Sequence, residues 1–80
     1  MKNWEVVNNT LQKEFVFKNF THAITFVNKV AELSESVDHH PDILIHDYKK
    51  ITFFLTTHSQ GGMSEKDYTL AAQIDKLFVD

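Results

Sequence analysis

The spacing of apolar residues near the N-terminus predicts a β-hairpin. Trp4 to Val7 form a short β-prone run, and Leu11, Lys13, Phe15 and Phe17 then follow at a period of two. A period of two places alternate residues on one face of a strand. Asn8 and Asn9 separate the two runs, and asparagine tolerates the left-handed backbone that tight hairpin turns need.

The hydrophobic period changes to that of a helix after residue 19. Apolar residues and one serine then recur every three or four positions: Phe20, Ala23, Ile24, Val27, Val30, Ala31 and Ser34. Asn19 can cap this helix, because its side-chain oxygen can accept from the first free backbone N–H groups. We expect the helix to end near Val37, because Pro41 cannot continue it and biases His40 towards extended backbone.

The next pattern predicts two more strands. Residues 43–48 are expected to form a third strand, and residues 51–58, rich in β-branched and aromatic side chains, a fourth. One face of the fourth strand would present Ile51, Phe53, Leu55 and Thr57, and the other Thr52, Phe54, Thr56 and His58. The face of a sheet that no helix covers is normally exposed to solvent, so an apolar residue on that face, Phe54, indicates that a binding partner covers it.

A second helix completes the pattern. Ser64 begins it, and Asp67 follows three residues later in a capping-box arrangement. Its apolar stripe contains Asp67 itself, Leu70, Ala71, Ile74, Leu77 and Phe78. We therefore expect residues 1–80 to form one α+β domain of order β-β-α-β-β-α, a four-stranded antiparallel sheet with helices packed on one face.

Composition narrows the classes of function. The net charge of −3 argues against a nucleic-acid surface, which normally has a basic excess. The absence of cysteine excludes disulfides, thiolate metal sites and cysteine nucleophiles. No apolar run approaches the roughly 18 residues of a membrane span, and the first residues lack the apolar core of a signal peptide. The expectation is a cytoplasmic protein that contacts neither membrane nor nucleic acid.

Candidate chemistry is concentrated just before Pro41. Glu35, Asp38, His39 and His40 cluster where a helix gives way to a strand, and loops held by rigid elements often carry function. The histidine side chain has an ordinary pKa of about 6.5, so this residue type can both give and take a proton at neutral pH. On composition alone, however, adjacent histidines more often form only a solvated polar turn.

Two residues further along are weaker candidates when each is taken alone. A histidine at a strand end, such as His58, is more often bonded to a nearby carbonyl than catalytic. Asp67 suits the first turn of a helix electrostatically, but it lies on the inward stripe, where a purely capping acid need not lie. We assign no role to His22 and His46. Zinc is an alternative, but adjacent histidines are awkward ligands for one metal and no His-Glu-x-x-His pattern occurs, so no metal is expected.

These residues together resemble the signature of the pterin-4a-carbinolamine dehydratases. That signature is Glu, three residues, His-His-Pro, six residues, an aromatic residue, nine residues, His and a later Asp. Here its positions are filled by Glu35, His39, His40, Pro41, Tyr48, His58 and Asp67. The segments HHPDILIHDYKK and THSQGGMSEKDYTLAAQID are also similar to bacterial members. The resemblance extends over nearly the whole chain from Trp4.

The resemblance implies a hydro-lyase that needs no cofactor. Such enzymes dehydrate 4a-hydroxytetrahydrobiopterin to the quinonoid dihydropterin, and so recycle the tetrahydropterin that an aromatic amino acid hydroxylase has used. The family's catalytic positions fall on His39, His40, His58 and Asp67. Its pterin-binding positions fall on Glu35, Pro41, Thr57, Ser59 and Gln60. The family also implies a homodimer formed through the sheet, or a homotetramer.

Two departures from animal members affect ring packing and subunit contacts. Many animal members have tryptophan two residues after the proline, where this chain has Ile43. They also begin with an extra helix, which we expect to be short or absent here, because only three residues precede Trp4.

Two other functions stay open. Animal relatives double as dimerisation cofactors of a homeodomain transcription factor, so a non-catalytic interaction module of the same fold is the main alternative, and a zinc-binding protein is the other.

Overall fold

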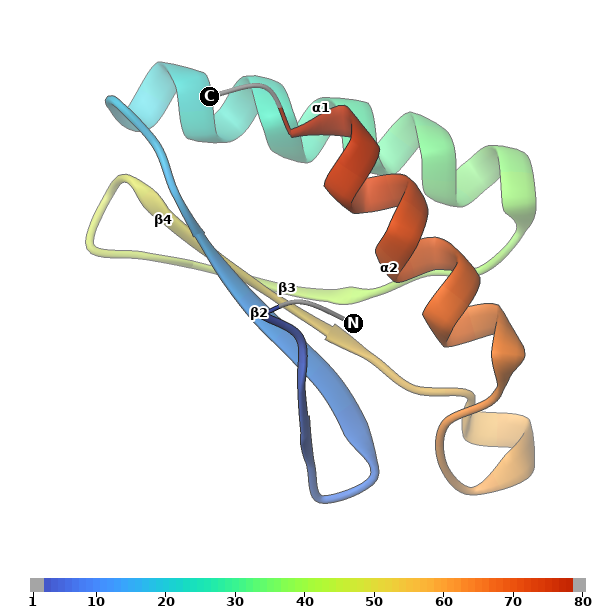
Figure 1. The fold of residues 1–80 in the computed structure, drawn as a ribbon. Coiled ribbons are helices and arrows are strands. Elements are labelled where there is room, and N and C mark those ends of the chain that lie inside the picture. The colour runs from blue at the N-terminus through green and yellow to red at the C-terminus, as the bar shows by residue number, and fades with distance from the viewer. Residues whose placement is uncertain (1–2, 79–80) are drawn as a thin grey trace.

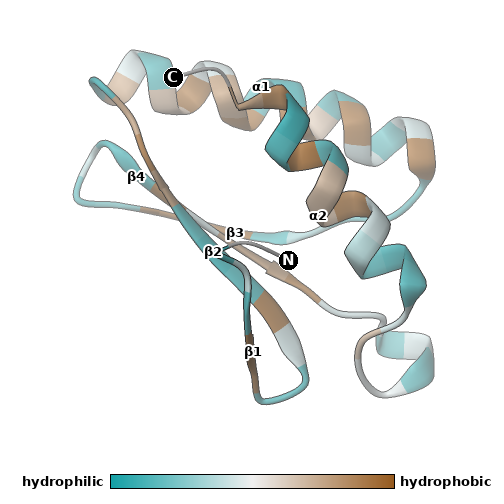
Figure 2. Cartoon of the chain, viewed as in Figure 1, coloured by the Kyte–Doolittle hydropathy of each residue, from teal (hydrophilic) through white to brown (hydrophobic). Residues whose placement is uncertain are grey.

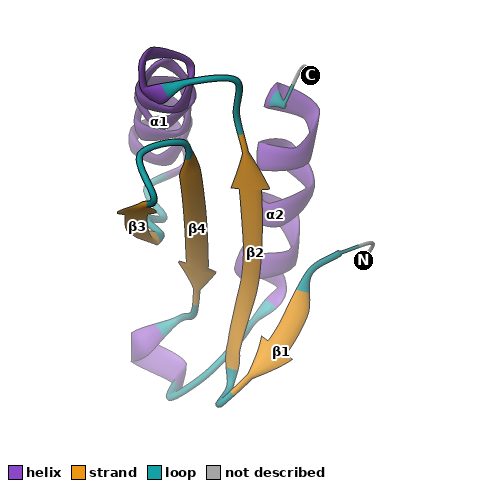
Figure 3. Ribbon diagram, turned by 90° about the vertical axis from the view of Figure 1, so that its left-hand side faces the viewer, coloured by secondary structure: helices purple, strands orange, loops and turns teal. Residues whose placement is uncertain are grey.

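The computed structural model describes residues 3–78 and shows one antiparallel sheet with two helices on one face (Figure 1). In chain order the elements are β1 (Glu5–Val7), β2 (Thr10–Val16), α1 (Phe20–Val37), β3 (Asp42–His46), β4 (Lys50–Leu55), the short 3₁₀ helix η1 (His58–Gln60) and α2 (Glu65–Leu77). The four strands lie in the order β1-β2-β4-β3, with β1 and β3 at the edges (Figure 3). The expected α+β fold is confirmed.

A two-residue turn connects β1 to β2 and a three-residue turn connects β3 to β4, and each contains two residues in left-handed conformation. Asn8 and Asn9 have φ angles of 51° and 60°, which confirms the turn expected from the sequence. Asp47 and Tyr48 have φ angles of 49° and 48° and form the second turn. The expectation that the third strand continues to Tyr48 was therefore wrong: β3 ends at His46 because the next two residues turn the chain back into β4.

Both helices begin where the sequence indicated, and α1 also ends there. The side chain of Asn19 accepts a hydrogen bond of 2.9 Å from the backbone N–H of His22, which caps α1. The helix ends at Val37, and Asp38 follows with a φ angle of 53°. Ser64 and Asp67 form the reciprocal capping box of α2, as expected.

The fourth strand is shorter than the sequence pattern suggested. Pairing stops at Leu55 with β2 and at Phe54 with β3, whereas the strand was expected to reach His58. The backbone of Thr57 instead pairs with Gly62 in an isolated bridge, and Gly61 turns with a φ angle of 70°. His58 consequently lies in η1 and not on the open face of the sheet, which corrects that part of the prediction.

The hydrophobic core lies between the sheet and the two helices. Phe15 is near its centre, with ring centroids 5.3 Å from Phe26, 5.7 Å from Phe53 and 5.0 Å from Phe78. Alternate residues of β4 face the helices, and Ile51, Phe53, Leu55 and, beyond the strand, Thr57 are buried as expected. Polar and apolar residues alternate along both helices (Figure 2). Neither helix within residues 3–78 is long and apolar enough to cross a bilayer.

Candidate functional site

The end of α1 and the first turn of α2 bring His39 and Asp67 together. The backbone N–H of His39 donates to the carbonyl of Ser34 over 3.2 Å, which fixes the residue relative to the end of α1. Its Nε2 lies 2.6 Å from Oδ1 of Asp67. The His39 side chain is largely buried and that of Asp67 is fully buried, so this pair is shielded from solvent.

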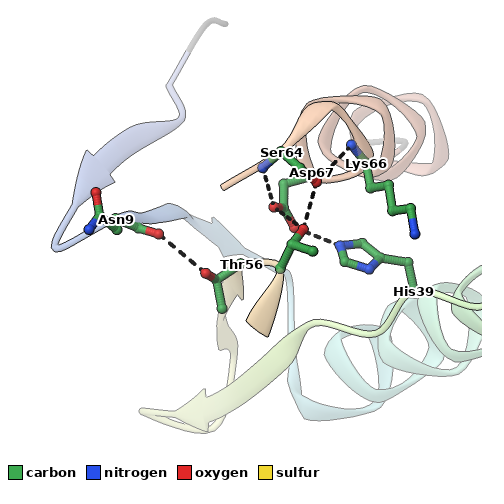
Figure 4. Close-up of polar contacts among 7 residues, drawn as sticks. Asn9, His39, Thr56, Ser64, Lys66 and Asp67 are labelled. Carbon is green, nitrogen blue, oxygen red and sulfur yellow. Dashed lines mark hydrogen bonds and ion pairs between the residues drawn. The ribbon is translucent and has the colours of Figure 1, made fainter. Parts of the chain in front are cut away.

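Asp67 is the centre of a polar cluster (Figure 4). Its Oδ2 accepts hydrogen bonds from Oγ1 of Thr57 at 2.8 Å and from the backbone N–H of Ser64 at 3.0 Å. The hydroxyls of Thr57 and Ser64 lie 2.7 Å apart. An ionised carboxylate only accepts hydrogen bonds, and here donors from three different residues converge on one. The buried charge is thereby compensated by hydrogen bonds, as buried charges must be.

His40 has a different environment from its neighbour. Its Nε2 lies 2.6 Å from Oε2 of Glu35, which is on the last turn of α1. Both side chains are exposed, so the pair is in contact with solvent. The two adjacent histidines thus each have a carboxylate partner, one inside the protein and one at its surface. Pro41 follows, half-buried, and leads the chain into β3.

The remaining predicted site residues lie on η1. His58, Ser59 and Gln60 are all exposed, and within residues 3–78 none of their side chains forms a hydrogen bond. Among the described residues, the side chain of Asp67 contacts His39, Thr57 and Ser64, and no hydrogen bond joins it to His58. The structure thus brings together His39, Thr57 and Asp67 in one group, and Glu35 and His40 in another.

A cavity of about 310 Å³ lies beside His39, between the end of α1 and α2. It is lined by Val37, His39, Glu65, Lys66, Thr69, Leu70 and Gln73. Its size is at the lower end of the range of small-molecule sites. In the described part of the chain, no three His, Asp or Glu side chains converge as the ligands of a metal ion would.

Sequence reasoning missed one member of this cluster. It identified Ser64 only as a helix cap, whereas the Ser64 hydroxyl also contacts Thr57 and so forms part of the support of Asp67. The available signal was the capping box itself. In a capping box the side chains of the Ser and the Asp lie close to each other. Because Asp67 faces inward, the motif also places the Ser64 hydroxyl beside the buried carboxylate.

Comparisons with known proteins identify the family. The model of the family described as pterin 4 alpha carbinolamine dehydratase matches residues 1–77. A protein of Picosynechococcus sp., provisionally named pterin-4-alpha-carbinolamine dehydratase, is 53% identical over 92% of this chain and 79% of its own length. A protein of Sulfolobus acidocaldarius with the same provisional name is 42% identical over 96% of this chain and 84% of its own length.

Solved structures agree with this match. The crystal structure of a transcriptional coactivator/pterin dehydratase from Brucella melitensis has a TM-score of 0.89 and 29% identity, covering 96% of this chain and 83% of its own. A pterin dehydratase-like protein described as a RuBisCO assembly factor in the alpha-carboxysome has a TM-score of 0.73 and 25% identity, covering 92% and 84%. Fold, sequence and family model thus agree, and the chain belongs to the pterin-4a-carbinolamine dehydratase family.

Proposed function

We propose that this protein removes water from a 4a-hydroxytetrahydropterin, as a hydro-lyase that uses histidines as general acid and base. Family membership supports the substrate class. The observation that carries the mechanism is the pair of adjacent histidines, His39 and His40, each with a carboxylate oxygen 2.6 Å from its Nε2. A carboxylate beside an imidazole orients the ring and stabilises its protonated form, which suits a group that must transfer protons.

The reaction needs two proton transfers and no cofactor. An acid must protonate the departing 4a-hydroxyl oxygen, and a base must take the proton from N5 of the pterin. A positioned acid or base accelerates such a step by about 10² to 10⁴-fold. We assign the two transfers to His39 and His40, one acting as acid and the other as base. His58 is the second candidate for the transfer at the hydroxyl.

The residues around the histidines would hold the pterin ring. Glu35 and Pro41 flank His39 and His40, and Thr57, Ser59 and Gln60 lie on or beside η1. Ring packing next to Pro41 would be aliphatic, because Ile43 stands where many animal members have tryptophan. In this role the protein would recycle, in the cytoplasm, the tetrahydropterin that an aromatic amino acid hydroxylase uses.

The direct test is stopped-flow dehydration of freshly made 4a-hydroxytetrahydropterin. The wild type should accelerate the reaction, and His39→Ala and His40→Ala should each lose most of that acceleration. His22→Ala is the matched control, because His22 is an exposed histidine in the first turn of α1, away from the cluster. A folded wild type that does not accelerate dehydration would contradict the proposal.

Edge strand β3 favours a second function, that of a protein-interaction module. Its residues Ile43, Leu44 and Ile45 are 36%, 49% and 42% exposed, a run of three apolar residues on an open edge. An unprotected edge strand of this kind readily pairs with another chain. We propose that a second copy pairs there and gives a homodimer, which can pair again into a tetramer. The coactivator and assembly-factor descriptions of two structural relatives are compatible with such a role.

A further inference from the structure

We infer that Thr57 is a positioning residue: with Ser64 it fixes the carboxylate of Asp67, and so holds His39 with Nδ1 as the ring atom left for proton exchange. The catalytic part of this inference rests on the proposed dehydratase function. The structural part, which concerns the hydrogen-bond directions and the tautomer of His39, stands on the geometry alone.

The direction of each hydrogen bond in the cluster follows from the number of donors. The Thr57 hydroxyl has one proton, and it donates this proton to Oδ2 of Asp67 over 2.8 Å. At the 2.7 Å contact between Thr57 and Ser64, the Ser64 hydroxyl must therefore be the donor. The Ser64 oxygen in turn accepts from the backbone N–H of Lys66 over 3.3 Å. Each hydroxyl thus donates once and accepts once, in a chain that starts at the first turn of α2 and ends on Asp67.

This chain fixes the orientation of the Asp67 carboxylate. Oδ2 accepts from both Thr57 and the backbone N–H of Ser64, whereas Oδ1 faces His39. Rotation of the carboxylate would break both hydrogen bonds to Oδ2, and the fully buried side chain of Asp67 has no solvent to replace them. Oδ1 is therefore held as a single acceptor aimed at the His39 ring.

The His39 ring must present a proton to that acceptor. Since the carboxylate accepts, Nε2 carries the hydrogen, and the neutral ring has its lone pair on Nδ1. Nδ1 is then the only ring nitrogen that can take a proton from the substrate, or give one back when the ring is protonated.

Thr57 also connects this support to η1. Its backbone N–H donates to the carbonyl of Gly62 over 2.9 Å, and the Gly62 N–H donates back over 3.4 Å. The bridge closes the loop that carries His58, Ser59 and Gln60. Thr57 is only 5% exposed, and its hydroxyl both donates and accepts a hydrogen bond. Thr57 thus connects η1 to Asp67, through its backbone on one side and its hydroxyl on the other. It would contribute to pterin binding by holding η1 and Asp67 in place.

The test compares Thr57→Val with Thr57→Ser. Valine keeps the shape but removes the hydroxyl, whereas serine keeps the hydroxyl. Thr52→Val is the matched control, because the Thr52 hydroxyl contacts a different histidine, His46, at 3.0 Å on the opposite face of the sheet. Thr57→Val should lower kcat about tenfold to hundredfold with KM within about threefold, since misplacing a catalytic group by even 1 Å can cost about 10² in rate. Thr57→Ser should restore most of kcat, and Thr52→Val should leave it unchanged.

A second readout is independent of activity. Long-range ¹H–¹⁵N NMR spectra of the histidine rings should show wild-type His39 as the Nε2–H tautomer, and Thr57→Val should broaden or mix this tautomer while Thr52→Val does not. An Nδ1–H tautomer in the wild type would overturn the inference even if Thr57→Val failed to fold. So would a folded Thr57→Val protein with wild-type kcat and tautomer. Failure of the wild type to dehydrate pterins would contradict the proposed function, while the NMR result would still decide the positioning of His39.

Discussion

Nε2 of His39 and Oδ1 of Asp67 lie 2.6 Å apart, although 28 positions separate the two residues in the sequence. The same carboxylate completes the capping box of α2, so Asp67 has a structural and a proposed functional role at once. The two roles can be separated, because they use different oxygen atoms. Oδ2 binds the helix cap and Thr57, whereas Oδ1 binds the histidine.

Asp67→Asn should lower both dehydratase activity and stability. The amide keeps the shape of the carboxylate but offers two N–H donors on one side, so it must oppose donors either at His39 or at Thr57 and Ser64. We expect kcat to fall by about 10²-fold or more, since the histidine is held in the wrong tautomer or position. The free energy of unfolding should fall by about 1–3 kcal/mol, the cost of a buried unsatisfied donor.

Stopped-flow kinetics and urea denaturation on the same preparations would measure both effects. Asp38→Asn is the matched control, because Asp38 is an exposed residue with a φ angle of 53°, a conformation that asparagine tolerates. Wild-type kcat in folded Asp67→Asn protein would exclude Asp67 from the proposed mechanism.

His40→Ala should differ from Asp67→Asn in its effect on stability: activity should fall strongly while stability stays almost constant. The His40–Glu35 pair is exposed, with 52% and 79% of the two side chains accessible, and exposed ion pairs contribute about 0–1 kcal/mol. The thermal unfolding midpoint should therefore change little, whereas kcat should fall by about 10² to 10⁴-fold. Differential scanning fluorimetry and single-turnover kinetics test this. If activity and stability fell together, His40 would have a structural role that its exposure does not indicate.

The fold could be predicted because its signals are local. Asn19 begins a helix, Pro41 prevents its continuation, and the Asn8-Asn9 pair forms a turn, each through the chemistry of one or two residues. Of the two strand ends that were predicted wrongly, the end of β4 lay where local preference was outweighed. Residues 56–58 have the composition of a strand, but the bridge between Thr57 and Gly62 draws the chain out of the sheet.

The partners of the candidate site residues could not be predicted from the sequence. The resemblance to the family signature implied His39, His40, His58 and Asp67 as a set, but it could not assign their hydrogen-bond partners, because these depend on how α1 and α2 pack. The support that Thr57 and Ser64 give to Asp67 could be predicted only in part, because the capping box places Ser64 beside Asp67 but no sequence pattern joins Thr57 to either residue. The contacts of Asp75 with Trp4 and Lys13 could not be predicted either, because they join residues more than 60 positions apart in the sequence.

Asp75→Asn should weaken the attachment of the N-terminal segment to α2. The carboxylate of Asp75 accepts hydrogen bonds from the indole N–H of Trp4 at 3.0 Å and from Nζ of Lys13 at 2.7 Å. Replacing it leaves the buried indole without its charged acceptor, so stability should fall by about 1–2 kcal/mol. Trp4 is the only tryptophan in the chain, so its fluorescence reports on this site alone.

The emission maximum of Trp4 should shift to longer wavelength in Asp75→Asn as water gains access to the ring. Glu32→Gln, an exposed acid on α1, is the control and should leave the spectrum unchanged. Dehydratase activity should stay near that of the wild type, because Asp75 is not part of the His39–Asp67 cluster. An unchanged emission spectrum in Asp75→Asn would mean that the hydrogen bond to Trp4 does not hold the indole in the core.

Leu44→Lys should dissociate the proposed homodimer without unfolding the monomer. Leu44 is in the middle of edge strand β3 and is 49% exposed, so a lysine there remains solvated in the single chain and should change stability by less than about 0.5 kcal/mol. In a dimer paired along β3, the new charge would be buried near its own copy, an arrangement that edge strands use to prevent association. Sedimentation velocity at several concentrations should show a dimer for the wild type and a monomer for the variant.

Val6→Lys is the matched control, because Val6 is an exposed apolar residue on the other edge strand, β1, and should leave the dimer intact. Dissociation by Val6→Lys and not by Leu44→Lys would place the interface at β1, and a wild type that is monomeric at every concentration would exclude both edges.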